Sequence, residues 1–86
     1  MASYKTVWRA SAERELKKLP RGVIANIVEL VATLAINPFP RGAVKLAGAD
    51  HIWRIRSSDY RLIYSVAGGT LVVEIVKVGH RREVYR

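Results

Sequence analysis

Apolar residues recur at helical spacing over two stretches in the first half of the chain, residues 12–19 and residues 23–36. Ser11 is the expected N-cap of the first helix, and Pro20 ends it. Asn37, which precedes a proline, ends the second helix. The apolar faces comprise Ala12, Leu16, Leu19, Ile24, Ile27, Val31, Leu34 and Ala35. The pattern predicts a helical hairpin whose apolar faces need a sheet to cover them.

The remaining segments alternate apolar and polar residues with the period of two that is typical of strands. Strand signals are found at residues 4–10, 52–57, 60–67 and 71–78. Short turns at Ser58–Asp59 and Gly68–Gly69 join the last three into an antiparallel meander, to which the first strand can be added. The order βααβββ predicts an α+β fold, in which residues 1–86 form a single domain and an antiparallel sheet packs on the α-hairpin.

Alternation also sorts the strand side chains between the two faces of the sheet. The face toward the helices is expected to carry Trp8, Trp53, Ile55, Leu62, Tyr64 and Val66. Arg54, Arg56 and Arg61 fall on the opposite face, and Arg81 joins them if pairing continues past Gly79. Like charges gathered this closely repel one another, so a bound phosphate chain explains the cluster better than stability does. The alternative is a solvated basic face.

Composition narrows the classes of function. The 86 residues carry a formal net charge of +8 and a pI near 10.5, which favours nucleic acid as a partner, although acidic protein chains and membranes also attract such proteins. The absence of cysteine excludes disulfides and thiolate metal sites. No stretch is long enough to span a membrane and the N-terminus shows no export signal, so we expect a soluble, cytoplasmic protein with no membrane partner.

Two runs near the C-terminus resemble the RelE branch of the RelE/ParE toxin superfamily. They are residues 56–64 (RSSDYRLIY) and residues 78–85 (VGHRREVY). Earlier segments fall in the order and spacing of that family, namely residues 16–20 (LKKLP), 37–38 (NP) and 45–48 (KLAG). The resemblance covers nearly the whole chain and implies a RelE-like toxin domain from a type II toxin–antitoxin system.

The activity of that family implies metal-independent cleavage of messenger RNA in the ribosomal decoding site, with no cofactor. The 2′-hydroxyl of the RNA attacks the adjacent phosphate, and guanidinium donors stabilise the added negative charge. Arg61 and Arg81 match the positions with that role, and Tyr85 matches a C-terminal tyrosine that is our candidate for proton transfer or base stacking. The alternative for Tyr85 is packing at the end of the sheet. Flanking RNA phosphates are expected to bind Lys45, Arg54, Arg56 and Arg82.

The sequence leaves open which residue transfers protons in this reaction. Ile52 and Arg54 stand where the family often has lysine, so we do not expect a lysine-dependent transfer. His80 is the candidate substitute, because imidazole titrates near neutral pH. Strict alternation sends His80 and Arg81 to opposite faces unless a bulge re-aims the histidine, which favours a surface or supporting role for it.

The resemblance also implies partners. We expect a cognate antitoxin that contributes an acidic amphipathic segment, the ribosome and messenger RNA as substrate partners, and operator DNA bound only through the antitoxin. The chain stops at Arg86, where many RelE-type toxins continue into a helix, so we expect an open apolar groove near Leu71, Val73 and Ile75.

Two alternative functions share this fold. One is ParE-like inhibition of DNA gyrase, although ParE toxins typically lack the constellation of Arg61, Arg81 and Tyr85. The other is a catalytically weak module that binds antitoxin and operator DNA.

Overall fold

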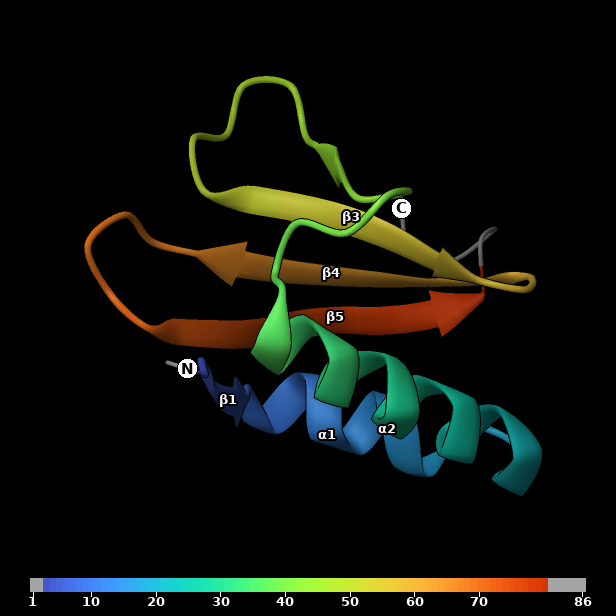
Figure 1. Cartoon of the computed structure of the whole chain (residues 1–86). Helices are drawn as coiled ribbons and strands as arrows, with labels where there is room; N and C mark the ends of the chain where they lie inside the picture. The colour runs from blue at the N-terminus through green and yellow to red at the C-terminus, as the bar shows by residue number, and fades with distance from the viewer. Residues whose placement is uncertain (1–2, 81–86) are drawn as a thin grey trace.

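Two helices pack against a five-stranded sheet (Figure 1). The computed structural model describes residues 3–80. The elements in chain order are β1 (Lys5–Trp8), α1 (Ala10–Lys17), α2 (Arg21–Ile36), β2 (Val44–Lys45), β3 (Ile52–Ser57), β4 (Tyr60–Val66) and β5 (Val72–His80). The strand order across the sheet is β1-β5-β4-β3-β2. The α+β class and the packing of a sheet on two helices are therefore confirmed.

The sheet differs from the expected one in two ways. The meander β3–β4–β5 is antiparallel as predicted, but β1 pairs with β5 in parallel, so the sheet is mixed. A parallel pair needs a long connection, and the whole chain from α1 to β4 supplies it. The second difference is the short strand β2, which pairs antiparallel with β3. Two residues are too few to produce a visible alternation.

Both helices begin two residues earlier than predicted. Helix α1 starts at Ala10, with Arg9 as the N-cap and no side-chain cap, so the assignment of Ser11 as N-cap is wrong. The carbonyl of Arg9 already accepts a hydrogen bond from the Glu13 N–H at 2.9 Å. Pro20 is the N-cap of α2, where its fixed φ suits a helix start. Helix α2 ends at Ile36, as the following Asn-Pro pair predicts.

The core lies between the helices and one face of the sheet. Its buried members include Ala12, Ile27, Val31, Leu34, Ile55, Leu62, Tyr64, Val66, Val73, Ile75 and Val78. The predicted core positions of Tyr64, Trp8 and Trp53 are confirmed: the first is fully buried, and the two tryptophans pack partly buried against the cluster. The Tyr64 hydroxyl donates a hydrogen bond of 2.6 Å to the Pro38 carbonyl. This bond ties the end of α2 to the middle of the sheet.

The apolar groove expected over Leu71, Val73 and Ile75 is not found among residues 3–80, and the hollow at the start of β5 is lined by other residues, including Val7, Thr70 and Val72. Val73 and Ile75 are fully buried, and only Leu71, which precedes the strand, is half exposed. Helix α1 covers the inner face of β5, and β1 pairs along its edge from Val72 to Ile75. Those two residues therefore belong to the core, and the expectation that a partner segment fills a groove over them is wrong.

Candidate functional site

Three arginines of β3 and β4 share the face of the sheet that points away from the helices. Ile55 lies opposite Leu62, and both are buried in the core. The next pair along the strands places Arg56 directly opposite Arg61, so these side chains leave the sheet on the other face. Arg54, two residues before Arg56, lies on that face as well. The common face predicted from alternation is confirmed for these three residues.

A two-residue turn sets this register. Ser57 pairs with Tyr60, and Ser58 and Asp59 connect the strands. Ser58 has a φ of 56°, in the left-handed region that two-residue hairpin turns require because such a turn follows the twist of the strands. A slip of one residue would move every side chain of β4 to the other face. The turn therefore keeps Arg61 beside Arg56.

The arginines border a cleft of about 660 Å³. Its lining includes four arginines, Arg41, Arg54, Arg56 and Arg61, but also Leu30 and Thr33 of α2, so the cleft extends around the edge of β3 to the helix side of the sheet. The cleft lies at an edge of the sheet, because β2 pairs with β3 only at Trp53 and Arg54. No acidic side chain among residues 3–80 lines it. This arrangement makes the cleft a strongly positive recess next to an open strand edge, suited to an extended anion.

Arg61, which lines this cleft, also has a buried hydrogen-bond donor without a partner. Its Nε is buried and makes no hydrogen bond within the part of the chain that the structure describes. A buried polar group without a partner is unfavourable by about 1–3 kcal/mol, and more when it is charged. Arg61 also lines the cleft, so a phosphate or carboxylate oxygen bound there is placed to accept hydrogen bonds from the accessible part of its guanidinium.

Arg41 is the cleft residue that sequence reasoning missed. It lies in the loop between α2 and β2, where no periodicity indicates which way a side chain points. The loop is held on one side by the bond from Tyr64 to Pro38, and on the other by pairing of β2 with β3. The sequence itself offered only an indirect signal, an arginine between Pro40 and Gly42 in the loop that precedes the arginine-bearing strands.

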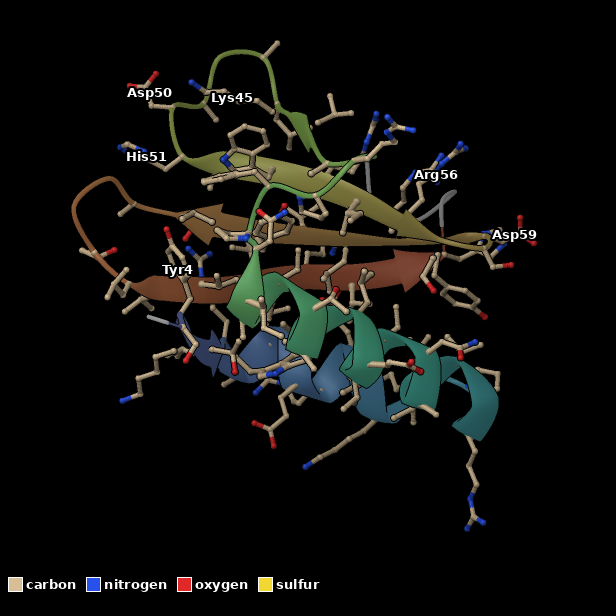
Figure 2. The ribbon with its side chains drawn as sticks, in the orientation of Figure 1. Tyr4, Lys45, Asp50, His51, Arg56 and Asp59 are labelled. Carbon is tan, nitrogen blue, oxygen red and sulfur yellow. The ribbon has the colours of Figure 1, made fainter. Side chains whose placement is uncertain are left out.

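Lys45 is not brought to the arginines. It lies on β2 opposite Trp53 and is not part of the cleft lining. Figure 2 shows Lys45 with Asp50 and His51 at one end of the molecule and Arg56 with Asp59 at the other. An RNA-binding role for Lys45 therefore requires a ligand that extends along the sheet beyond the cleft.

His80 lies on the face that the helices cover. It pairs with Tyr60 across β4 and β5, and the two rings meet edge to face with centroids 5.6 Å apart. The residue opposite Arg61 is Gly79. His80 borders a second cleft, together with Glu15 and Lys18. The separation of the histidine from the arginine face agrees with the alternation of the strand.

The other predicted site residues, Arg81, Arg82 and Tyr85, lie outside the described residues. Within residues 3–80, no three His, Cys, Asp or Glu side chains gather in a way that could hold a metal ion. Over the same residues, neither helix is long and apolar enough to cross a membrane.

Comparison with known proteins identifies the family to which this chain belongs. The model of the ParE toxin of type II toxin–antitoxin systems matches residues 6–85. The toxin RelE of Mycobacterium tuberculosis is 32% identical over 84 residues, which cover 96% of this chain and 87% of that toxin. The chain therefore belongs to the RelE/ParE superfamily of type II toxins, and it is a toxin of the RelE type.

Solved structures agree with this assignment. The archaeal RelE–RelB complex from Pyrococcus horikoshii OT3 matches with a TM-score of 0.83 and 29% identity, over 95% of this chain and 99% of that one. The isolated Escherichia coli RelE toxin matches with a TM-score of 0.81 and 29% identity, over 96% of this chain and 92% of that one. The fold is shared over nearly the whole length of each protein.

Proposed function

We propose that this toxin is an endoribonuclease that cuts messenger RNA on the ribosome and so inhibits translation. The observation that carries the proposal is the cleft in which Arg41, Arg54, Arg56 and Arg61 gather without an acidic neighbour among residues 3–80. Four guanidiniums in one recess suit a chain of phosphates, because arginine binds phosphate oxygens through paired N–H donors. The like-charge contacts of this cleft are unfavourable for the free protein, and a polyanion relieves them.

The chemistry proposed for the cleft needs no metal ion. The 2′-hydroxyl of the RNA loses its proton as its oxygen attacks the adjacent phosphorus. The bond to the 5′-oxygen of the next nucleotide breaks, that oxygen takes up a proton and leaves as a hydroxyl, and a 2′,3′-cyclic phosphate remains. Negative charge builds up on the phosphate oxygens in the transition state. Arg61, which lines the cleft, is suited to stabilise that charge by about 3–4 kcal/mol. Arg81 is assigned the same role, and Arg41, Arg54 and Arg56 hold flanking phosphates.

Proton transfer is assigned to Tyr85. Positive charge near a phenol favours the phenolate, which is the form that can accept a proton. The protein contributes few catalytic groups, so much of the rate must come from the ribosome, which holds the RNA in line for attack. Positioning of this kind supplies about 7–11 kcal/mol of the barrier. Free RNA is therefore expected to be a poor substrate.

We assign a cognate antitoxin as the inhibitor of this activity. The Pyrococcus relative is solved as a RelE–RelB complex, which supports an antitoxin partner. An acidic segment is expected to bring carboxylates to the arginine cleft, where it competes with RNA. Attraction between opposite charges speeds association, so the association rate is expected to fall as salt is added. Operator DNA is assigned to the complex rather than to the toxin alone.

A second candidate function is inhibition of DNA gyrase, because the family model that matches the chain is that of ParE. The experiment that separates the two functions combines a map of messenger RNA 5′ ends after brief expression with a gyrase supercoiling assay. Cuts within translated messages together with normal supercoiling are the expected result. Intact messages would contradict the nuclease, and blocked supercoiling would favour the ParE-like activity. Intact messages together with normal supercoiling would favour the remaining alternative, a catalytically weak module that binds antitoxin and operator DNA.

A further inference from the structure

The second half of β5 lies at a sheet edge that no described strand covers. β1 pairs with β5 as far as Ile75, and the Arg9 N–H donates to the Ile75 carbonyl at 3.0 Å. The chain then turns away into α1, which begins at Ala10. A backbone N–H that points to this edge after Ile75 needs an acceptor from another element.

Glu15 on α1 supplies that acceptor. Its Oε1 accepts a hydrogen bond of 3.3 Å from the Val78 N–H, and its Oε2 lies 2.9 Å from the Lys77 Nζ. Both charged side chains are about one-third exposed. A single carboxylate thus holds two consecutive residues of β5 from the side of the helix.

These two residues directly follow a β-bulge. Tyr64 pairs with Ile75 and Ile63 pairs with Lys77, so Val76 is an additional residue in β5. The extra residue reverses the alternation beyond it. Uninterrupted pairing would bring Lys77 opposite the buried Leu62 and Val78 opposite Arg61. In the structure, Val78 is opposite Leu62 and Gly79 is opposite Arg61.

We infer that Glu15 is a positioning residue of the arginine cleft. By holding Lys77 and Val78 it fixes the bulged pairing that sets Gly79 opposite Arg61. Glycine has no side chain, so no cross-strand side chain competes with the guanidinium for space on that face. Glu15 itself does not line the cleft and acts only through β5. The inference rests on the proposed ribonuclease function for its effect on cleavage, but not for its effect on strand pairing.

The test uses the full-length toxin and three variants. Glu15→Ala removes both contacts, Glu15→Gln keeps an oxygen acceptor for the Val78 N–H, and Glu13→Ala is the matched control. Glu13 is a neighbouring acid on the same helix, and within residues 3–80 it forms an exposed ion pair with Lys17 at 3.4 Å. The measurements are the amide exchange rate of Val78, the contact between the amide protons of Arg61 and Gly79 by NMR, single-turnover cleavage of ribosome-bound message, and ribosome affinity.

Glu15→Ala is expected to speed Val78 exchange, weaken the Arg61–Gly79 contact and lower the cleavage rate by about 10- to 100-fold, while ribosome affinity changes by less than about twofold. Glu15→Gln is expected to recover most of the rate, and Glu13→Ala to match the wild type. If Glu15→Ala does not fold, Glu15→Asp replaces it, because the shorter carboxylate cannot reach both partners.

Wild-type cleavage and an unchanged Arg61–Gly79 contact in the Glu15 variants would overturn the inference. So would a loss of rate that Glu13→Ala shares, since that would indicate general destabilisation. If the wild type itself cuts no message, the proposed function fails, and the exchange and NMR measurements still decide whether Glu15 sets the strand pairing.

Discussion

Arg56 and Arg61 lie directly opposite each other on β3 and β4. Like charges at such a cross-strand position destabilise a sheet by up to about 1 kcal/mol, and less where solvent screens them, as it does at the exposed Arg56. The tight turn between the strands sets this pairing. Among residues 3–80, no acidic side chain lines the cleft to relieve the repulsion. A polyanion bound in the cleft would turn this repulsion into a source of affinity.

Substitution of Arg61 is therefore expected to separate activity from stability. Arg61→Gln removes a donor from the transition state, and the cleavage rate of ribosome-bound message should fall by about 10²–10³-fold. The free energy of unfolding in urea should stay the same or rise by a few tenths of a kcal/mol, because one half of the like-charge pair is gone. Arg14→Gln, on the exposed side of α1, removes the same charge and should leave the rate unchanged. A rate loss that tracks a loss of stability would refute this assignment.

Arg41 is expected to contribute to binding rather than to the chemical step. Arg41→Ala should weaken the affinity for a single-stranded RNA oligonucleotide and reduce the slope of log K against log salt by about 0.7, the value for one phosphate contact. Titrations at several salt concentrations measure both quantities. Arg14→Ala is again the control. An unchanged slope would mean that Arg41 borders the cleft without contacting RNA.

Arg81 is assigned to the transition state through the family resemblance. Arg81→Ala should lower single-turnover cleavage by about 10²–10³-fold while ribosome affinity changes by less than about threefold. Weakened affinity together with intact single-turnover cleavage would make Arg81 a positioning contact instead.

Tyr64 is expected to limit stability at alkaline pH. Burial raises the pKa of its hydroxyl from 10 to about 12, because the phenolate loses its hydration. The unfolded chain ionises first, so the stabilisation is complete below pH 10 and is lost as the pH rises toward 12, by about 3 kcal/mol in all. Urea unfolding from pH 8 to pH 12 measures this loss.

Tyr64→Phe supplies the comparison for that titration. It should be about 1–2 kcal/mol less stable than the wild type at pH 8, since the Pro38 carbonyl loses its donor. Its stability should fall less steeply above pH 10. Parallel curves for the two proteins would show that other tyrosines cause the alkaline loss.

Simple alternation was sufficient to predict the arginine face. Residues 53–56 and 61–66 change sides at every step, so the sequence alone separates Arg54, Arg56 and Arg61 from the core. The bulge at Val76 left only a weak sign: Glu74 and Lys77 are three residues apart, so strict alternation cannot keep both away from the core, but the apolar residues around them do not show where the period breaks. The parallel partner of β1 was hidden as well, since a pattern of side chains does not give the direction of pairing. Arg41 reaches the cleft through loop geometry, which depends on the Tyr64–Pro38 contact far away in sequence.

The shortness of β2 has a consequence for behaviour at high concentration. Beyond Arg54, the outer edge of β3 has no strand partner among residues 3–80, and a bare edge of this kind can pair with the same edge of another molecule. Arg56 on this strand, with Arg61 beside it, makes two such edges repel each other. The charges assigned to RNA binding are thus also expected to oppose the joining of toxin molecules into a continuous sheet. Neutralising both arginines would remove this protection, and the doubly substituted protein is expected to aggregate at concentrations where the wild type stays monomeric.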